Sequence, residues 1–222
     1  MFVPNTQPDQ IPELNSFLEE WGMSVGSGVM FELSTDHLYN NTTPFWSAAE
    51  YVDEDYSSVI TNKSIPVSVM QSRPIEILKE SESIKVLLES TENSGIYPVD
   101  AAEGWQPEES DLTGPITLAA VSTKQVSGVD DVSNVAVVGS AAAFASSLLS
   151  STSVNNSAYF INMFNTLAER EDTVLIEAKT LGGATMSVTT NVSIPLGVVF
   201  TIVLPLLILV TGLVIWIRRR NR

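Results

Sequence analysis

The sequence predicts an α/β domain with a layered, mostly parallel sheet, followed by one C-terminal transmembrane helix. Apolar runs typical of strands alternate with amphipathic segments typical of helices, which favours α/β layering. The run Val135–Val138 is apolar without interruption, as in strands that are buried on both faces. Residues 194–217 carry no charge and, at about 1.5 Å per residue, are long enough to cross a hydrocarbon core of about 30 Å.

The first predicted helix covers residues 11–22. Pro12 suits a first helical turn and Gly22 a C-terminal cap. The helical spacing of its apolar side chains indicates a face that docks on the sheet, formed by Leu14, Phe17, Leu18 and Trp21.

The remaining elements follow from alternation, turn residues and caps. Ser140 is predicted to cap a helix over residues 141–149, and Asn156 a longer helix that ends at Arg170. Residues 93–113 are rich in turn formers and acids and are predicted as a surface loop. Strands are predicted at residues 25–32, 66–70, 84–91, 116–121, 134–139 and 174–179.

Charge and the lack of cysteine exclude several function classes. All 26 acidic residues precede the predicted span, whereas four of the 11 basic residues follow it. Such an acidic domain argues against nucleic-acid binding, which needs clustered Lys and Arg. The absence of cysteine excludes disulfides, thiolate zinc sites and a thiol nucleophile. It also fits a bacterial surface better than a eukaryotic one.

The basic residues after the predicted span set the expected topology. Because positive charge prefers the cytoplasmic side, the domain at residues 1–180 is expected outside a bacterial cell membrane. A linker at residues 181–193, the span at 194–217 and a cytoplasmic tail at 218–222 complete the chain. The residues expected to fix the anchor and its topology are Pro205, Gly212, Trp216, Arg218, Arg219 and Arg220.

Residues 1–8 contain neither the basic nor the apolar region of an export signal. We therefore expect the chain to be the C-terminal part of a larger protein with an upstream segment. The alternative is a tail-anchored protein whose arginines lie outside.

The sequence offers few groups for catalysis. His37 has no second His and no Cys beside it, so a solvated loop residue is the expected reading. Gly139-Ser140 lies between a strand and a helix, but the G-x-S-x-G and Gly-rich phosphate patterns are absent. An ordinary tight turn is therefore expected there, with anion binding at the helix start as an alternative.

Acidic and aromatic clusters leave further alternatives open. Residues 50–55 and 108–111 could bind Ca²⁺ but lack EF-hand spacing, so solvated acidic loops are expected. A glycosidase carboxylate pair stays open, because too many acids compete for that role. Trp21, Trp46 and Trp105 are expected as core or loop anchors, with sugar stacking as the alternative. We predict no catalytic residue, metal or cofactor.

Taken in order, several segments resemble the GldG-like extracytoplasmic auxiliary components of bacterial ABC-2 type transporters, a family associated with gliding motility. Residues 11–25 resemble its first helix and strand, residues 112–119 its Gly-Pro strand start, and residues 135–146 its Val-Val-Gly strand and following helix. Residues 156–171 resemble its Asn-rich helix, and the anchor its last span. Where the family usually has acidic residues after the Val-Val-Gly strand, this chain has Ser140 and three alanines.

The resemblance implies a non-catalytic accessory subunit of an ABC transporter. The fold would be flavodoxin-like or amidotransferase-like, and the anchor would pack beside a permease. An ATPase subunit would bind ATP, because this chain has no P-loop. Two other functions stay open: a surface-anchored hydrolase or carbohydrate-active enzyme, and a sensor or adhesin domain that works alone.

Overall fold

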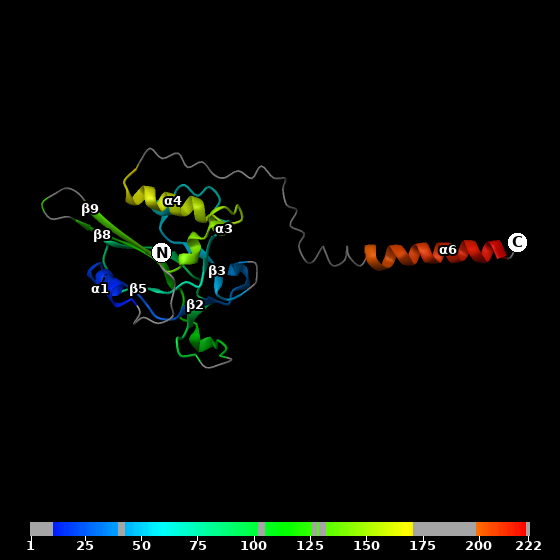
Figure 1. Cartoon of the computed structure of the whole chain (residues 1–222), viewed down its shortest axis with the longest axis horizontal. Coiled ribbons are helices and arrows are strands. Elements are labelled where there is room, and N and C mark those ends of the chain that lie inside the picture. The colour runs from blue at the N-terminus through cyan, green and yellow to red at the C-terminus, as the bar shows by residue number, and fades with distance from the viewer. Residues whose placement is uncertain are drawn as a thin grey trace. The chain divides into compact units, whose positions relative to one another are not determined.

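The computed structural model describes residues 11–39, 43–101, 105–125, 128, 132–170 and 199–220. The chain divides into two compact units, Met1–Lys179 and Thr180–Arg222 (Figure 1). The predicted strand at 174–179, the linker at 181–193 and the start of the predicted span at 194–198 lie outside the described residues.

A five-stranded sheet forms the centre of the first unit. Its spatial order is β4-β3-β6-β8-β9, so β4 and β9 are its edges. The longest pairing joins β8 and β9, from Ala119 opposite Val138 to Gln125 opposite Val132. The strands are β3 (Trp46–Tyr51), β4 (Val67–Met70), β6 (Ile84–Glu89), β8 (Thr117–Gln125) and β9 (Val132–Val138).

Two smaller sheets have two strands each, and these strands lie before or between the five strands of the main sheet in the sequence. β1 (Met23–Val25) pairs with β5 (Ile75–Ile77), and β2 (Val29–Glu32) pairs with β7 (Ser94–Tyr97). The single strand predicted at residues 25–32 is therefore wrong. Gly28 has a φ of +82°, which turns the chain between two strands that belong to different sheets.

The predicted mostly parallel α/β sheet is wrong. Every strand pair among the described residues is antiparallel. The prediction failed at β9, whose apolar run was taken as the mark of a buried parallel strand. Ala136 and Val138 contact one hydrophobic cluster, and Val135 and Val137 contact another. The run therefore reflects apolar packing on both faces, which does not depend on strand direction.

Two helices contribute buried side chains to these two clusters, one from each face of the sheet. α4 (Asn156–Leu167) buries Tyr159, Phe160 and Met163 in the larger cluster. α1 (Pro12–Glu20) buries Leu18 in the smaller one. Figure 1 shows α4 and α1 on either side of β8 and β9. The helix predicted at residues 11–22 is confirmed, although Leu14 and Phe17 of its predicted docking face stay exposed.

The two predicted helix caps have different outcomes. Ser140 Oγ accepts a hydrogen bond from Ala143 N at 3.2 Å, which confirms a cap. The helix that follows is broken into η5 (Ala141–Phe144) and α3 (Ser146–Leu149). Asn156 is not a cap, because it is the first residue of α4.

Short helical turns lie between the strands. They are η2 (Thr35–His37), α2 (Glu54–Ser57) and η4 (Glu109–Asp111). Asp53 caps α2 by accepting from Asp55 N and Tyr56 N. The surface loop predicted at 93–113 contains β7 and η4, so it is more ordered than expected.

Side chains close the β4 edge of the five-stranded sheet. Asn156 accepts from Ser68 N and donates to Ser68 O, both at 2.8 Å. Ser140 Oγ donates to Met70 O at 2.7 Å and accepts from Met70 N at 3.3 Å. These side chains take the place of a neighbouring strand, so the outward polar groups of β4 are satisfied.

The described part of the second unit is helical. It consists of η6 (Val199–Val203), a π-helical turn, and α6 (Leu204–Arg220). The segment Phe200–Arg220 is long and apolar enough to span a membrane, and none of it is buried within the structure. The predicted apolar C-terminal helix is thus present.

Candidate functional site

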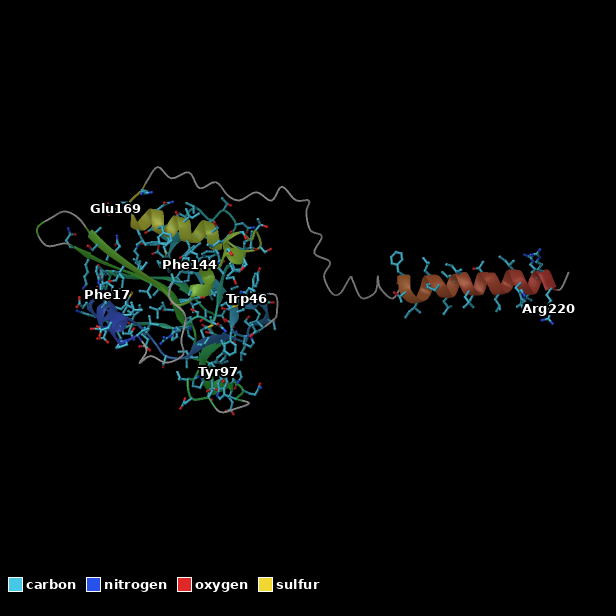
Figure 2. All side chains as sticks on the ribbon, viewed as in Figure 1. Phe17, Trp46, Tyr97, Phe144, Glu169 and Arg220 are labelled. Carbon is cyan, nitrogen blue, oxygen red and sulfur yellow. The ribbon has the colours of Figure 1, made fainter. Side chains whose placement is uncertain are left out.

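The residues predicted to fix the anchor lie on α6. Pro205 is the second residue of α6, directly after the π-helical turn. Because proline has no N–H, it cannot donate a backbone hydrogen bond back into that turn. A side chain at Gly212 would meet no atom within 4 Å. The Arg220 guanidinium lies 5.5 Å from the centre of the Trp216 ring, at the charged end of the helix (Figure 2). An aromatic ring beside arginines at the end of an apolar helix is typical of a membrane interface.

The turn at Gly139-Ser140 is structural. Ser140 is fully buried, and its hydroxyl is engaged by Met70 and Ala143. A Cβ on Gly139 would collide with the backbone oxygen of Arg73. The glycine therefore permits close chain approach, as an ordinary tight turn does, and the serine hydroxyl is not available as a nucleophile.

His37 has more partners than the sequence indicated. Its Nδ1 lies 3.3 Å from Ser34 Oγ, and its Nε2 lies 3.3 Å from Glu50 Oε1. Ser34 precedes η2, whereas Glu50 comes from β3, 13 positions after His37 in the sequence. A carboxylate that orients an imidazole beside a hydroxyl is the arrangement that activates serine nucleophiles.

A pocket of about 460 Å³ adjoins this histidine. Asp36, His37 and Glu50 line it with Tyr51 and Lys63, so both signs of charge face its interior. A pocket of this size falls within the range of small-molecule sites. No sequence motif marks this pocket, because the residues that meet there come from separate turns and strands.

Glu50 also faces a second carboxylate. It lies directly opposite Glu89 in the pairing of β3 with β6. Burial raises the pKa of Glu89, a hydrogen bond with Thr117 lowers it, and the negative charge of Glu50 raises it further. The pair is a cross-strand contact between two inner strands of the sheet, and like charges directly opposite each other are destabilising.

The predicted acidic loops form caps and ion pairs. Lys85 Nζ lies 2.8 Å from Asp55 and 3.4 Å from Asp53. Glu108 and Asp111 form a reciprocal capping box around η4. No group of three or more potential metal ligands occurs in the part of the chain that the structure describes.

The predicted aromatic anchors lie in ring contacts. Trp105 packs edge-on against Phe31 and Tyr97, with ring centres 5.6 and 5.0 Å apart. The Trp46 ring lies 4.7 Å from the Tyr39 ring, and its Nε1 donates to Ser68 Oγ. These contacts are those of anchors that hold loops on the sheet.

An apolar groove of about 270 Å³ runs between α1 and the edge of the sheet. Leu14, Phe17 and Leu18 of α1 line one side together with Val25 of β1, and residues 135–138 of β9 line the other. Phe17 of α1, labelled in Figure 2, is 48% exposed. The groove therefore presents an uncovered apolar surface beside a strand edge.

Arg73 is a buried charge that sequence reasoning missed. Its side chain is fully buried, and its Nε and Nη2 both donate to Gly26 O. Nη1 has no hydrogen-bond partner among the described residues. Burial lowers the pKa of this guanidinium. No motif marks the position, since an isolated arginine before a proline usually indicates an exposed turn.

Comparison with known proteins adds little to these features. No protein-family model matches the chain. No curated protein matches it either. Among solved structures, it is similar to one described as "mmIFT52 N-terminal domain", with a TM-score of 0.49 and 15% sequence identity. The match covers 73% of this chain and 60% of that one, so the chain spans less than two thirds of that structure's length.

Proposed function

We propose that the protein is a membrane-anchored accessory subunit of an ABC transporter and has no catalytic role of its own. The observation that carries the proposal is the helix Phe200–Arg220, which is apolar, unburied and ends in three arginines. The 22 residues of η6 and α6 would extend about 33 Å, which matches a hydrocarbon core of about 30 Å.

The charges on the two sides of this helix support one orientation. Arg218, Arg219 and Arg220 lie in its last turn, and such residues prefer the cytoplasmic side. The acidic first unit would then lie outside the membrane of a bacterial cell. An acidic surface is repelled by anionic lipid, which suits a domain that is held away from the bilayer.

The small residues on α6 support a contact with other membrane helices. Gly212 leaves one part of the helix surface without a side chain, and Thr211 Oγ1 bonds to Leu207 O within the helix. Small residues let helix backbones approach closely in lipid, where packing drives association. The permease of the transporter is the proposed neighbour, and a separate ATPase subunit would bind ATP.

Co-purification tests the proposal. The full chain, tagged and extracted from its own bacterium in a mild detergent, should bring down a permease and an ATPase. A matched variant, Gly212→Leu, keeps the span apolar but fills the small surface, and it should lose most of that recovery. If the unaltered chain purifies alone under conditions that preserve a known ABC complex, the proposal is wrong.

Topology can be tested separately, because the chain contains no cysteine. Ser81→Cys lies in an exposed turn of the first unit, and Asn221→Cys lies in the tail. A membrane-impermeant maleimide added to intact cells should label the first and not the second. The opposite labelling pattern would show that the orientation is reversed, and it would not test the proposed transporter role.

A second candidate function is a surface-anchored hydrolase, which the Ser34–His37–Glu50 contacts beside the pocket favour. His37 would act as the base for the Ser34 hydroxyl, and Glu50 would orient the ring. A fluorophosphonate probe should then label the protein, and Ser34→Ala should abolish the labelling. An unlabelled protein removes this candidate.

A further inference from the structure

The pocket beside His37 lies where the pairing of β3 with β4 ends. β3 pairs with β4 from Trp46 to Ala49, whereas its last two residues pair with β6 instead. Ala48 and Ala49 of β3 are buried and line the pocket, and their short side chains leave space. The remaining lining comes from η2, from the end of β3 and from the segment that leads into β4, namely Asp36, His37, Glu50, Tyr51, Lys63, Ser64 and Pro66.

Hydrogen bonds hold the segment that carries Lys63 in place. Asn155 Nδ2, directly before α4, donates to Asn62 O at 3.1 Å and to Ile65 O at 2.7 Å. Tyr51 Oη of β3 also donates to Ile65 O, at 2.8 Å. The backbone on both sides of Lys63 is therefore fixed by other parts of the domain, although the lysine itself is exposed.

A buried carboxylate holds the turn that carries Asp36 and His37. Glu32 is fully buried, and its Oε1 accepts from Ser34 N at 2.8 Å and from Thr91 Oγ1 at 2.9 Å. His37 N donates to Ser34 O at 2.9 Å, which closes the turn. The two segments that bring charge to the pocket are thus ordered before any ligand arrives. A preformed site lowers the ordering cost of binding.

Two of the charges that line the pocket have no partner of opposite sign. His37 and Glu50 lie 3.3 Å apart, but neither Asp36 nor Lys63 takes part in an ion pair among the described residues. A ligand with one ammonium and one carboxylate satisfies both. A ligand with only negative charge is disfavoured by a domain with 26 acidic and seven basic residues before the anchor. A ligand with only positive charge leaves Lys63 unpaired.

We propose that this pocket binds a small zwitterion of the amino-acid or dipeptide class. Its ammonium pairs with Asp36, its carboxylate pairs with Lys63, and its apolar part lies on Ala48 and Ala49. A volume of about 460 Å³ corresponds to about 15 water-sized groups at about 30 Å³ each, which is the size of such a molecule. Binding of this kind goes beyond the proposed accessory role, and it requires neither a transporter partner nor hydrolysis.

Calorimetric titration of the full chain in detergent tests the binding. Alanyl-alanine and free leucine are the probes, and saturable binding of either one supports the proposal and indicates the preferred size. N-acetyl-alanyl-alanine lacks the ammonium, and alanyl-alanine amide lacks the carboxylate. Each blocked dipeptide should bind about tenfold more weakly than alanyl-alanine, as expected for the loss of one charge-assisted hydrogen bond.

Substitutions assign each charge of the ligand to its partner. Lys63→Gln should weaken binding of alanyl-alanine by about tenfold but leave binding of the amide unchanged. Asp36→Asn should weaken binding of alanyl-alanine to the same extent but leave binding of the N-acetyl form unchanged. Lys79→Gln is the matched control, because Lys79 is exposed, does not line the pocket and changes the net charge equally.

Three results would overturn the proposal. One is the absence of saturable binding of both probes up to about 10 mM, with tryptophan fluorescence showing that the protein is folded. Another is that both blocked dipeptides bind as tightly as alanyl-alanine. The last is that Lys79→Gln weakens binding as much as Lys63→Gln, which would assign the effect to net charge. None of these results depends on co-purification with a transporter, so the two proposals can fail independently.

Discussion

Replacing Asn156 by alanine should destabilise the first unit more than any other single amide substitution on α4. The fully buried Asn156 makes three hydrogen bonds. Oδ1 accepts from Ser68 N at 2.8 Å, and Nδ2 donates to Ser68 O at 2.8 Å and to Ala143 O at 2.9 Å. Ser68 and Ala143 are fully buried as well, so water cannot replace the lost partner.

The size of the effect follows from these three bonds. A typical intramolecular hydrogen bond contributes about 1 kcal/mol net, and a buried group left without a partner costs about 1–3 kcal/mol. Asn156→Ala should therefore lower the free energy of unfolding by about 3–5 kcal/mol. For a chain of this length, about 2–4 °C per kcal/mol corresponds to a Tm lower by roughly 6–20 °C.

Urea unfolding of the full chain in detergent, followed by tryptophan fluorescence, measures this loss. Trp46 is a suitable reporter because its Nε1 donates to Ser68 Oγ at 2.6 Å, beside the altered contact. Asn165→Ala on the same helix is the matched control. Its side chain is only half-buried, so a change within about 0.5 kcal/mol is expected. A loss below about 1 kcal/mol for Asn156→Ala would refute the argument that this side chain closes the β4 edge.

Three further predictions concern charge and close packing. Because the pKa of Glu89 is raised in the folded state, the free energy of unfolding should rise as the pH falls through that pKa. Glu89→Gln should flatten this rise between pH 7 and pH 5 and, at pH 7, stabilise the fold by on the order of 0.5 kcal/mol in urea unfolding. An unchanged pH profile would contradict the prediction. Arg73→Met should be neutral or stabilising in the same assay, while Arg73→Ala should cost about 2–4 kcal/mol because it leaves a cavity; equal losses would show that the charge itself is needed. Gly139→Ala should lower the Tm by several degrees because its Cβ meets the Arg73 backbone, and an unchanged Tm would show that this turn can relax.

The sequence predicted where most elements lie but not how they pair. Helix 11–22 and the strands at 66–70, 84–91, 116–121 and 134–139 correspond to α1, β4, β6, β8 and β9. Local periodicity controls these positions, since it reports which side chains are buried. Strand direction depends on the connections. The segment between β6 and β8 brings β8 back antiparallel and contributes β7 to another sheet, and no local pattern encodes that path.

Long-range polar contacts were the least predictable features. An asparagine at the start of an amphipathic run indicates an N-cap, yet Asn156 bonds a strand 88 positions away. His37 was expected to be solvated because no other ligand is near it in the sequence, and its carboxylate partner comes from β3. In both cases the sequence prediction considered only neighbouring residues, whereas the partners of the side chain come from other elements of the fold.

The two edges of the sheet are linked through α4, which contacts one edge at each of its ends. The β4 edge depends on Asn156 at the first turn of α4, and the β9 edge lies at the last turn of the same helix. A substitution that loosens the start of α4 should therefore also weaken the contact of Leu167 with Asn134 at its other end. Asn156→Ala should then speed amide hydrogen exchange at the end of α4 as well as in β4, whereas Asn165→Ala should change neither. If only the amides of β4 exchange faster, the two edges are independent of each other.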